Sequence, residues 1–230
     1  QLAICFPSDI SGSAIFEKAI KRLDGIDHTI SLNLTTYKKK DEKKSKEINV
    51  NIHFGRDKKI YKMIYLEEGS NGSKGRELLI HEYEDKTMKT WVKYPKSGKV
   101  KEIKNKKLSK KIDITEITIP LSFLDKQIKI LSDDIVNDVS CKVVEISNED
   151  EKIRLWIDLD DFIVHKKEYY DKKSKLYKVI EYSNLTVQGK IKFYKNIKTK
   201  YIKDKTTTDL VVNEFKTIDF KDNEIFKVPK

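Results

Sequence analysis

The sequence contains little cysteine, proline, glycine and tryptophan, and it contains no long apolar run. A membrane-spanning helix needs roughly 20 consecutive apolar residues, and no stretch of this chain approaches that length, so the sequence predicts no such helix. The two cysteines, Cys5 and Cys141, can form one disulfide in an oxidising compartment or can both stay free. Their spacing does not distinguish these two alternatives.

Arginine is also scarce, although the chain is strongly basic. The net charge is +11, from 48 basic and 37 acidic residues, but nearly all the basic residues are lysines, which are scattered along every predicted strand. A nucleic-acid site would gather basic and exposed aromatic residues in one place, and the best such group, Tyr169-Tyr170 among lysines, is a weak match. The pattern favours a lysine-coated outer face, with a polyanion-binding or nucleic-acid-binding module as the less favoured alternative.

Sequence signatures of catalysis are missing as well. The sequence has no Gly-x-Ser-x-Gly elbow, Walker loop or dinucleotide fingerprint. The segment Gly69–Gly75 lacks P-loop spacing and is predicted to be a mobile connection. Asp158, Asp160 and Asp161 follow a predicted strand, and we interpret them as a solvated bend. We therefore expect that the protein is not an enzyme.

Metal-binding patterns are equally absent from the sequence. The four histidines stand singly on different predicted elements, without a second ligand at metal-site spacing. These residues are His28, His53, His81 and His165. We expect neither a bound metal nor a cofactor.

What the sequence does contain is a change of hydrophobic period near its start. From Gly12 to Asp24, apolar residues recur at helical spacing, which predicts an amphipathic helix. From Thr29 onward the period is two, and about a dozen short strands follow, interrupted by a short helix that begins at Pro120. Because strands and helices do not alternate, we predict a mainly β protein with a few helices, built on one antiparallel sheet that is strongly curled or closed.

One predicted hairpin carries bulky aromatic residues in an otherwise basic surface. Trp91 and Tyr94 precede Pro95-Lys96-Ser97-Gly98, in which Pro and Gly favour a tight turn. The return strand is predicted to start at Lys99. Trp91 must either be buried or contact an apolar ligand, and the sequence leaves both readings open.

The order of the predicted elements resembles the LolA-like outer-membrane lipoprotein-sorting family, also called lipoprotein carriers. The resemblance covers roughly residues 12 to 220 and depends on modest motifs in a fixed order. They are the N-terminal helix, Gly55-Arg56-Asp57, Trp91-Val92-Lys93-Tyr94-Pro95, the helix that begins at Pro120, and Leu155-Trp156-Ile157-Asp158. We interpret residues 1–11 as a lead-in and residues 12–230 as one LolA-like domain.

Members of this family fold as an unclosed β-barrel whose apolar inner face is covered by helices, and they shield lipoprotein acyl chains there during transport across the periplasm. The resemblance implies a periplasmic, monomeric carrier chaperone that uses no cofactor and binds no nucleic acid. The implied partners are acylated lipoproteins, an inner-membrane lipoprotein-releasing complex and an outer-membrane acceptor. Each buried CH₂ contributes about 0.8 kcal/mol, so partial enclosure of acyl chains would give useful affinity.

The resemblance also implies a set of lipid-binding and lid residues. Arg56 matches an arginine that holds the lid closed in carrier members and helps to drive cargo transfer, although Asp57 follows it where those carriers usually have Pro. Leu121, Phe123 and Leu124 match the plug-helix segment. The residues expected to line the cavity are Ile52, Phe54, Met63, Tyr65, Trp91 and Trp156.

A membrane-anchored receptor or sensor of the same fold is the alternative within the family. It would carry a lipid on Cys5, and Leu2-Ala3-Ile4-Cys5 only loosely resembles the end of a bacterial lipoprotein signal. A thioether-linked lipid on Cys5 would favour the receptor, whereas a processed, unmodified N terminus would favour the carrier.

Overall fold

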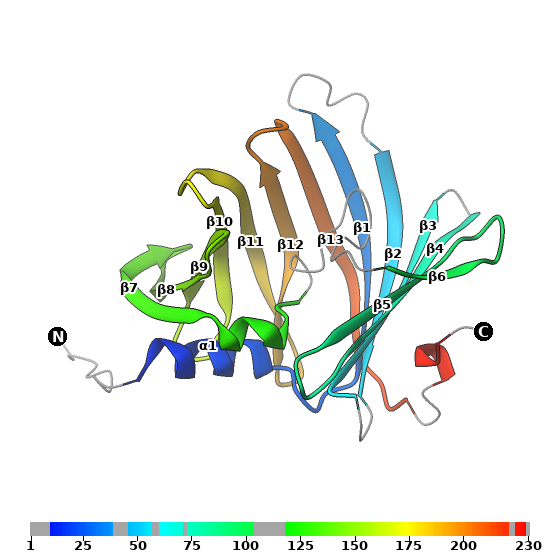
Figure 1. Cartoon of the computed structure of the whole chain (residues 1–230), viewed down its shortest axis with the longest axis horizontal. Coiled ribbons are helices and arrows are strands. Elements are labelled where there is room, and N and C mark those ends of the chain that lie inside the picture. The colour runs from blue at the N-terminus through cyan, green and yellow to red at the C-terminus, as the bar shows by residue number, and fades with distance from the viewer. Residues whose placement is uncertain are drawn as a thin grey trace.

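The chain folds around one curled antiparallel sheet of 13 strands (Figure 1). The computed structural model describes residues 10–38, 46–56, 60–70, 73–103, 118–220 and 224–228. Its helical elements are the α-helix α1 (Gly12–Lys21) and the 3-10 helices η2 (Leu121–Asp125) and η3 (Glu224–Phe226). The strands are β1 (His28–Lys38), β2 (Lys46–Gly55), β3 (Lys62–Ser70), β4 (Ser73–Glu82), β5 (Met88–Lys93), β6 (Val100–Ile103), β7 (Gln127–Val136), β8 (Val139–Ser147), β9 (Glu151–Ile157), β10 (Val164–Asp171), β11 (Leu176–Gln188), β12 (Ile191–Tyr201) and β13 (Thr206–Thr217).

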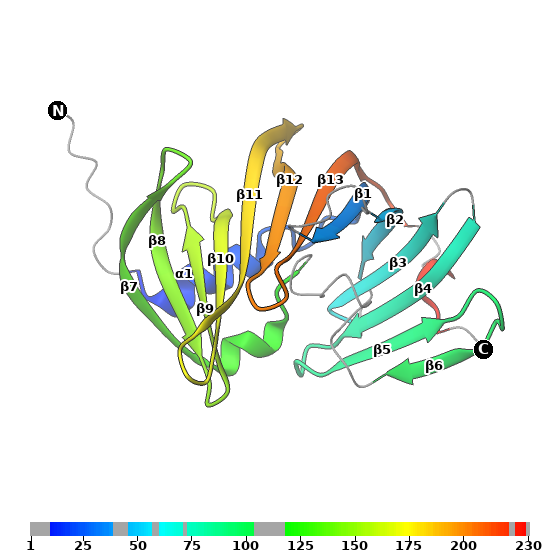
Figure 2. The same ribbon diagram turned by 90° about the horizontal axis from the view of Figure 1, so that it is seen from above.

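The sheet consists of two meanders that meet where β1 pairs with β13. The strand order is β6-β5-β4-β3-β2-β1-β13-β12-β11-β10-β9-β8-β7, so β6 and β7 are the edge strands of the sheet in the part of the chain that the structure describes. Viewed from above, the sheet bends into an arch with β6 and β7 at its opposite ends (Figure 2). This arrangement confirms the predicted single antiparallel sheet and shows that it is curled but not closed.

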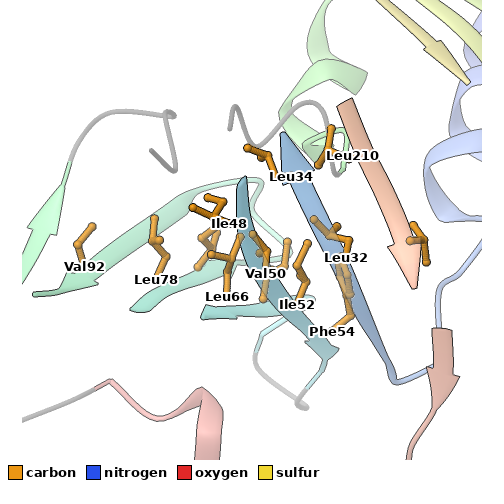
Figure 3. Packing of buried hydrophobic residues seen from close by; sticks show 13 residues of the cluster. Leu32, Leu34, Ile48, Val50, Ile52, Phe54, Leu66, Leu78, Val92 and Leu210 are labelled. Carbon is orange, nitrogen blue, oxygen red and sulfur yellow. The ribbon is translucent and has the colours of Figure 1, made fainter. Parts of the chain in front are cut away.

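Two clusters of buried apolar side chains cover the concave, inner face of the sheet. The side chains of the first inner cluster project from one face of β1 to β5 and β13 (Figure 3). The second inner cluster joins α1 and η2 to strands β8 to β11. The first consists of Leu32, Leu34, Ile48, Val50, Ile52, Phe54, Ile64, Leu66, Leu78, Ile80, Val92, Leu210 and Val212; the second consists of Ile15, Phe16, Phe123, Val144, Ile146, Ile153, Leu155, Ile157, Tyr169, Ile180 and Tyr182.

Helix α1 begins at a side-chain cap and packs across the second inner cluster. Ser11 is the N-cap residue, and its Oγ accepts a hydrogen bond from the backbone N–H of Ala14 at 3.2 Å. A Cβ atom on Gly12 would lie 3.3 Å from backbone atoms of Lys129 and Ile130, so glycine lets the helix approach β7 closely. The helix ends at Lys21, before the predicted end at Asp24, because residues 22–25 form a turn. Within the residues that the structure describes, no helix combines the length and apolarity needed to span a membrane.

A third apolar group, the outer cluster, lies on the opposite face of β3 to β5. It consists of Met63, Leu79 and Phe226, with Ile60, Tyr65, Trp91 and Phe220 packed against it. The ring of Phe226 lies over Gly55, and His81 Nε2 is 2.8 Å from the carbonyl oxygen of Phe226. The segment around η3 therefore covers the outer face of this half of the sheet.

Replacing Gly55 by alanine should loosen this outer contact. A Cβ atom there would lie 2.5 Å from Phe226 Cε2, so the Phe226 ring would have to move out of its buried position. Overpacking of this kind costs about 1 to 3 kcal/mol of unfolding free energy, which urea denaturation can measure. Leucine at position 226 should remove part of that cost in the double variant, and purely additive effects of the two substitutions would contradict the proposed contact.

The strands differ from the sequence prediction at a few places. Strand β7 was not predicted from the sequence, because its apolar residues are largely exposed and do not alternate clearly with polar residues. Strand β3 ends at Ser70 and strand β4 begins at Ser73, so most of Gly69–Gly75 belongs to these two strands and not to a mobile loop. The turn predicted after Tyr94 is confirmed: Gly98 has φ of 63°, and its N–H donates to the carbonyl oxygen of Tyr94 at 2.9 Å.

Candidate functional site

A cavity of about 260 Å³ lies between α1 and the inner face of the sheet. The C-terminal half of α1 and the turn that follows it form one side of the cavity. Strands β1, β2 and β10 to β13 form the other side. Its apolar lining consists of Ala19, Ile20, Leu23, Ile26, Ile30, Leu32, Ile52, Phe54, Ile119, Phe162, Ile163, Val164, Phe193, Ile197, Leu210 and Val212, and Tyr182 and Tyr194 add their rings.

The apolar wall of the cavity on β1 and β2 is formed by alternate residues of these strands, whose side chains point to the inner face of the sheet. Ile30 pairs with Ile52 across the two strands, so both side chains lie on the same face of the sheet. Phe54 pairs with His28, and the two rings stack with their centroids 4.4 Å apart. Helix α1 contributes Ala19 and Ile20, one turn beyond the fully buried pair Ile15 and Phe16.

His28 is a buried polar group within this apolar wall. Its Nδ1 donates to the carbonyl oxygen of Ile26 at 2.8 Å, and its ring also stacks on Phe215 at 5.1 Å. Burial lowers the pKa of His28 to about 4, and the nearby cations Lys62 and Arg22 act in the same direction. The imidazole is therefore neutral at neutral pH.

Charged groups gather where the α1–β1 turn meets the C-terminal end of β2 and the N-terminal end of β3. The Tyr61 hydroxyl donates to Asp24, and Lys62 Nζ donates to Thr118 Oγ1 at 3.3 Å. Arg56 is exposed, and its guanidinium lies against the backbone of Gly25. Burial raises the pKa of the Asp27 carboxyl, while the nearby charge of Arg56 opposes that rise. One end of the cavity is thus polar and its walls are apolar.

A chain of hydrogen bonds connects the cavity wall to a buried carboxylate. The Tyr194 hydroxyl lies 2.6 Å from His165 Nδ1, and His165 Nε2 lies 2.8 Å from Asp158 Oδ2. Burial opposes the charged form of Asp158, but hydrogen bonds from His165 and from the N–H groups of Asp161 and Ile163 outweigh it and lower its pKa. The carboxylate accepts from His165 Nε2, which leaves Nδ1 to accept from Tyr194.

This hydrogen-bonded chain corrects the interpretation of Asp158 as part of a solvated bend, because Asp158 is buried and holds the turn together. Burial and the charge of Asp158 raise the pKa of Tyr194 well above its ordinary value. The phenol therefore remains protonated and serves as a hydrogen-bond donor on the cavity wall.

The structure brings together only part of the predicted site. Ile52, Phe54 and Arg56 all border the cavity. Phe123 belongs to the second inner cluster, Leu124 packs against that cluster, and Leu121 is buried. None of these three residues borders the cavity, which is bordered instead by the preceding residues Thr118 and Ile119. The plug segment thus contributes to the cavity through its first residues and supports α1 through the rest.

Four of the predicted lining residues lie on the other face of the sheet. Met63, Tyr65 and Trp91 belong to the outer cluster, and the centroids of the Trp91 and His81 rings are 5.0 Å apart. Trp156, with 6% of its surface exposed, packs with Cys141 and Val143, and its indole N–H donates to Asp134 at 2.8 Å. The expected cavity position is therefore corrected for all four residues, because their strands bury apolar side chains on both faces.

Sequence reasoning missed the lining that comes from α1 and the second half of the sheet. Leu210 and Val212 alternate with Asp209 and exposed Val211 along β13, a pattern that could have indicated their inward direction.

Of the two cysteines, Cys141 is a buried free thiol, and burial raises its pKa to about 11. Cys5 lies outside the described residues. In those residues, no group of His, Cys, Asp and Glu has the arrangement of a metal site.

An unclosed, curled antiparallel sheet with a helix across its inner face is the LolA-like fold, and solved structures share it. A domain described as an outer membrane lipoprotein-sorting protein, from Vibrio parahaemolyticus, superposes with a TM-score of 0.80 at 16% identity, covering 94% of this chain and 95% of that chain. A LolA superfamily protein from Nitrosomonas europaea superposes with a TM-score of 0.73 at 16% identity, covering 96% of this chain and 99% of that chain. A DUF1329 family protein from Desulfovibrio piger superposes with a TM-score of 0.79 at 15% identity, covering 95% of this chain and 98% of that chain.

A family model with the description "-like: Uncharacterized protein" matches residues 58–229. The chain belongs to this family, whose description specifies no activity. A comparison with curated proteins finds no match to the chain. The comparisons therefore establish the LolA-like fold and the family.

Proposed function

We propose that this protein is a periplasmic lipoprotein carrier that holds acyl chains in the cavity beneath α1 and releases them toward the outer membrane. The observation that carries the proposal is the cavity itself, whose walls are apolar side chains from α1 and from both halves of the sheet. In this proposal the protein acts as a monomer and performs no covalent chemistry. It receives lipoproteins from a releasing complex of the inner membrane and passes them to an outer-membrane acceptor.

In this proposal, the cavity opens when cargo binds. Sites for drug-sized ligands are usually about 300 to 1,000 Å³, so a cavity of about 260 Å³ cannot enclose several acyl chains. Among the described residues the sheet ends at the edge strands β6 and β7, and α1 contacts the sheet through apolar side chains. Displacement of α1 would enlarge the cavity while the strand pairing remained intact.

Competition with a fluorescent probe that binds apolar cavities tests this function. A triacylated cysteine peptide should displace the probe in a saturable manner, and the same peptide without acyl chains should not. An Ile30→Trp variant should lose probe binding and displacement, because Ile30 is half-buried and borders the cavity, so an indole would fill it.

A matched substitution separates cavity filling from a general effect of added tryptophan. Val211 is exposed and is not a lining residue, so Val211→Trp should behave like the unmodified protein. Both variants are first checked for native circular dichroism. Equal displacement by the acylated and unacylated peptides, or unchanged displacement in Ile30→Trp, would contradict the carrier function.

A further inference from the structure

The hairpin formed by β11 and β12 extends beyond its neighbours in the sheet. Pairing of β10 with β11 ends at Lys166 and Glu181, and pairing of β13 with β12 ends at Val211 and Asn196. Beyond these points, residues 183–195, which we call the projecting ribbon, pair only within the hairpin. In the part of the chain that the structure describes, this ribbon therefore has no flanking strand on either side.

The projecting ribbon exposes two apolar side chains. Leu185 and Val187 are 44% and 59% exposed, and they are two residues apart on β11, so they point to the same side of the ribbon. Leu185 lies directly opposite Tyr194, which borders the cavity. Apolar surface therefore continues from the edge of the cavity to the exposed part of the ribbon.

The charge of the projecting ribbon is entirely positive. Its sequence contains Lys190, Lys192 and Lys195 and no carboxylate. Lys192 pairs with Asp161, whereas Lys190 and Lys195 are exposed and form no ion pair among the described residues. Two lysines are thus available to an anionic partner beside the exposed apolar side chains.

The hairpin of β7 and β8 shows the opposite combination of charge and exposure. Ile135 on this hairpin is 70% exposed, but Asp133, Asp134 and Asp138 lie close to it in the sequence. An anionic surface would repel such a tip. Exposure of an apolar residue and positive charge therefore coincide on the projecting ribbon and not on every hairpin.

The projecting ribbon is held in place at its turn and at its base. Gly189 has φ of 61° and begins the two-residue turn between Gln188 and Ile191, where a hairpin requires a positive φ. At the base, the Tyr194 hydroxyl lies 2.6 Å from His165 Nδ1. The ribbon is thus ordered before any partner binds, which reduces the entropy cost of binding.

We propose that the projecting ribbon docks on the surface of an anionic lipid bilayer, with Leu185 and Val187 at the boundary of headgroups and acyl chains and with Lys190 and Lys195 against the phosphate groups. Apolar side chains of interfacial elements enter that boundary, and each lysine near an anionic surface adds attraction. Two apolar side chains offer far less area than the roughly 1,200 to 2,000 Å² of a stable protein interface, which favours a lipid surface over a protein. The inference goes beyond the proposed function, since a protein can dock in this way without carrying acyl chains.

Flotation of the full chain with lipid vesicles tests the docking. Vesicles of equal parts phosphatidylglycerol and phosphatidylcholine should bind the protein at least about tenfold more tightly than vesicles of phosphatidylcholine alone, because two lysines act on the anionic surface. Equal binding to the two kinds of vesicle would overturn the inference.

Matched variants distinguish the projecting ribbon from the rest of the lysine-rich surface. Leu185→Ser and Lys190→Gln should each weaken binding to the anionic vesicles about fivefold. The turn at the other end of β12 supplies the controls, because Ile202 is 45% exposed and Lys203 is also exposed. Ile202→Ser and Lys203→Gln should leave binding unchanged, and losses as large as those of the ribbon variants would overturn the inference.

A position-specific signal provides a second test that does not depend on affinity. Brominated phosphatidylcholine in the anionic vesicles should quench the emission of the added indole in Val187→Trp and not in Ile202→Trp. The native Trp91 and Trp156 contribute equally to both variants. Equal quenching in the two variants would mean that the ribbon does not enter the bilayer surface.

The proposed function and this inference can fail separately. Ile30→Trp fills the cavity and should keep vesicle binding, whereas loss of that binding would mean that lipid enters the cavity and would overturn the docking. If the triacylated peptide displaces the probe while the ribbon variants bind vesicles normally, the carrier function stands and the docking is refuted. If the ribbon variants lose vesicle binding while the peptide does not compete, the docking stands and the carrier function is refuted.

Discussion

Replacing Phe16 by alanine is expected to lower the free energy of unfolding by about 3 to 5 kcal/mol. The Phe16 side chain is completely buried and belongs to the second inner cluster, which joins α1 to the sheet. Removing the ring leaves a space that the surrounding strands can fill only in part, and the helix loses a main contact with the inner face. Urea denaturation, followed by circular dichroism, measures the loss.

An exposed apolar residue provides the control for this substitution. Ile135 on β7 is 70% exposed, so Ile135→Ala should change the unfolding free energy by less than about 0.5 kcal/mol. A loss below about 1 kcal/mol for Phe16→Ala would mean that α1 contributes little to the fold. The same variant should also bind the cavity probe more weakly, since α1 forms one side of the cavity.

The second large effect concerns pH and His28. Burial lowers the pKa of this histidine from 6.5 to about 4, so the unfolded chain binds more protons than the folded protein between these two values. The unfolding free energy should therefore fall as the pH falls from about 6.5 to about 4, by about 3 kcal/mol from this group alone. The contribution of His28 is complete above pH 6.5.

A glutamine at position 28 separates this histidine from the other groups that titrate nearby. Burial also lowers the pKa of His53 and His81, whereas it raises the pKa of Glu82 and Asp27, which act in the opposite direction. His28→Gln keeps a hydrogen-bond donor but cannot titrate. Its unfolding free energy should decrease less steeply between pH 6.5 and 4, and slopes equal to those of the unmodified protein would show that His28 is not the responsible group.

Strands β1 and β2 could be predicted from the sequence because only one face of each strand is apolar. Ile48, Val50, Ile52 and Phe54 alternate with polar residues along β2, and all four belong to the first inner cluster. Alternation then identifies both the strand and the direction of its side chains. The alternation agrees with the cavity position that the resemblance implied for Ile52 and Phe54.

In strands that bury apolar residues on both faces, the hydrophobic alternation could not show which side chains point toward the inner face of the sheet. On β3, Ile64 faces the inner cluster while Met63 meets the segment around η3, so neither neighbour is polar. On β9, Leu155 and Trp156 have the same ambiguity. Which face is concave depends on the curl of the whole sheet and on what covers each side, and both result from contacts between distant parts of the chain.

The pairing of β1 with β13 also determines when this protein can complete its fold. Residues 28–38 find one of their two partner strands in residues 206–217, so the centre of the sheet joins segments that lie far apart in the sequence and are synthesised at different times. Until β13 emerges, β1 remains an unpaired edge and the apolar side chains of β1 to β5 lack Leu210 and Val212. Folding should therefore be slow for a chain of this size and end with a single non-local closure, and the unfinished chain needs protection from aggregation until that step.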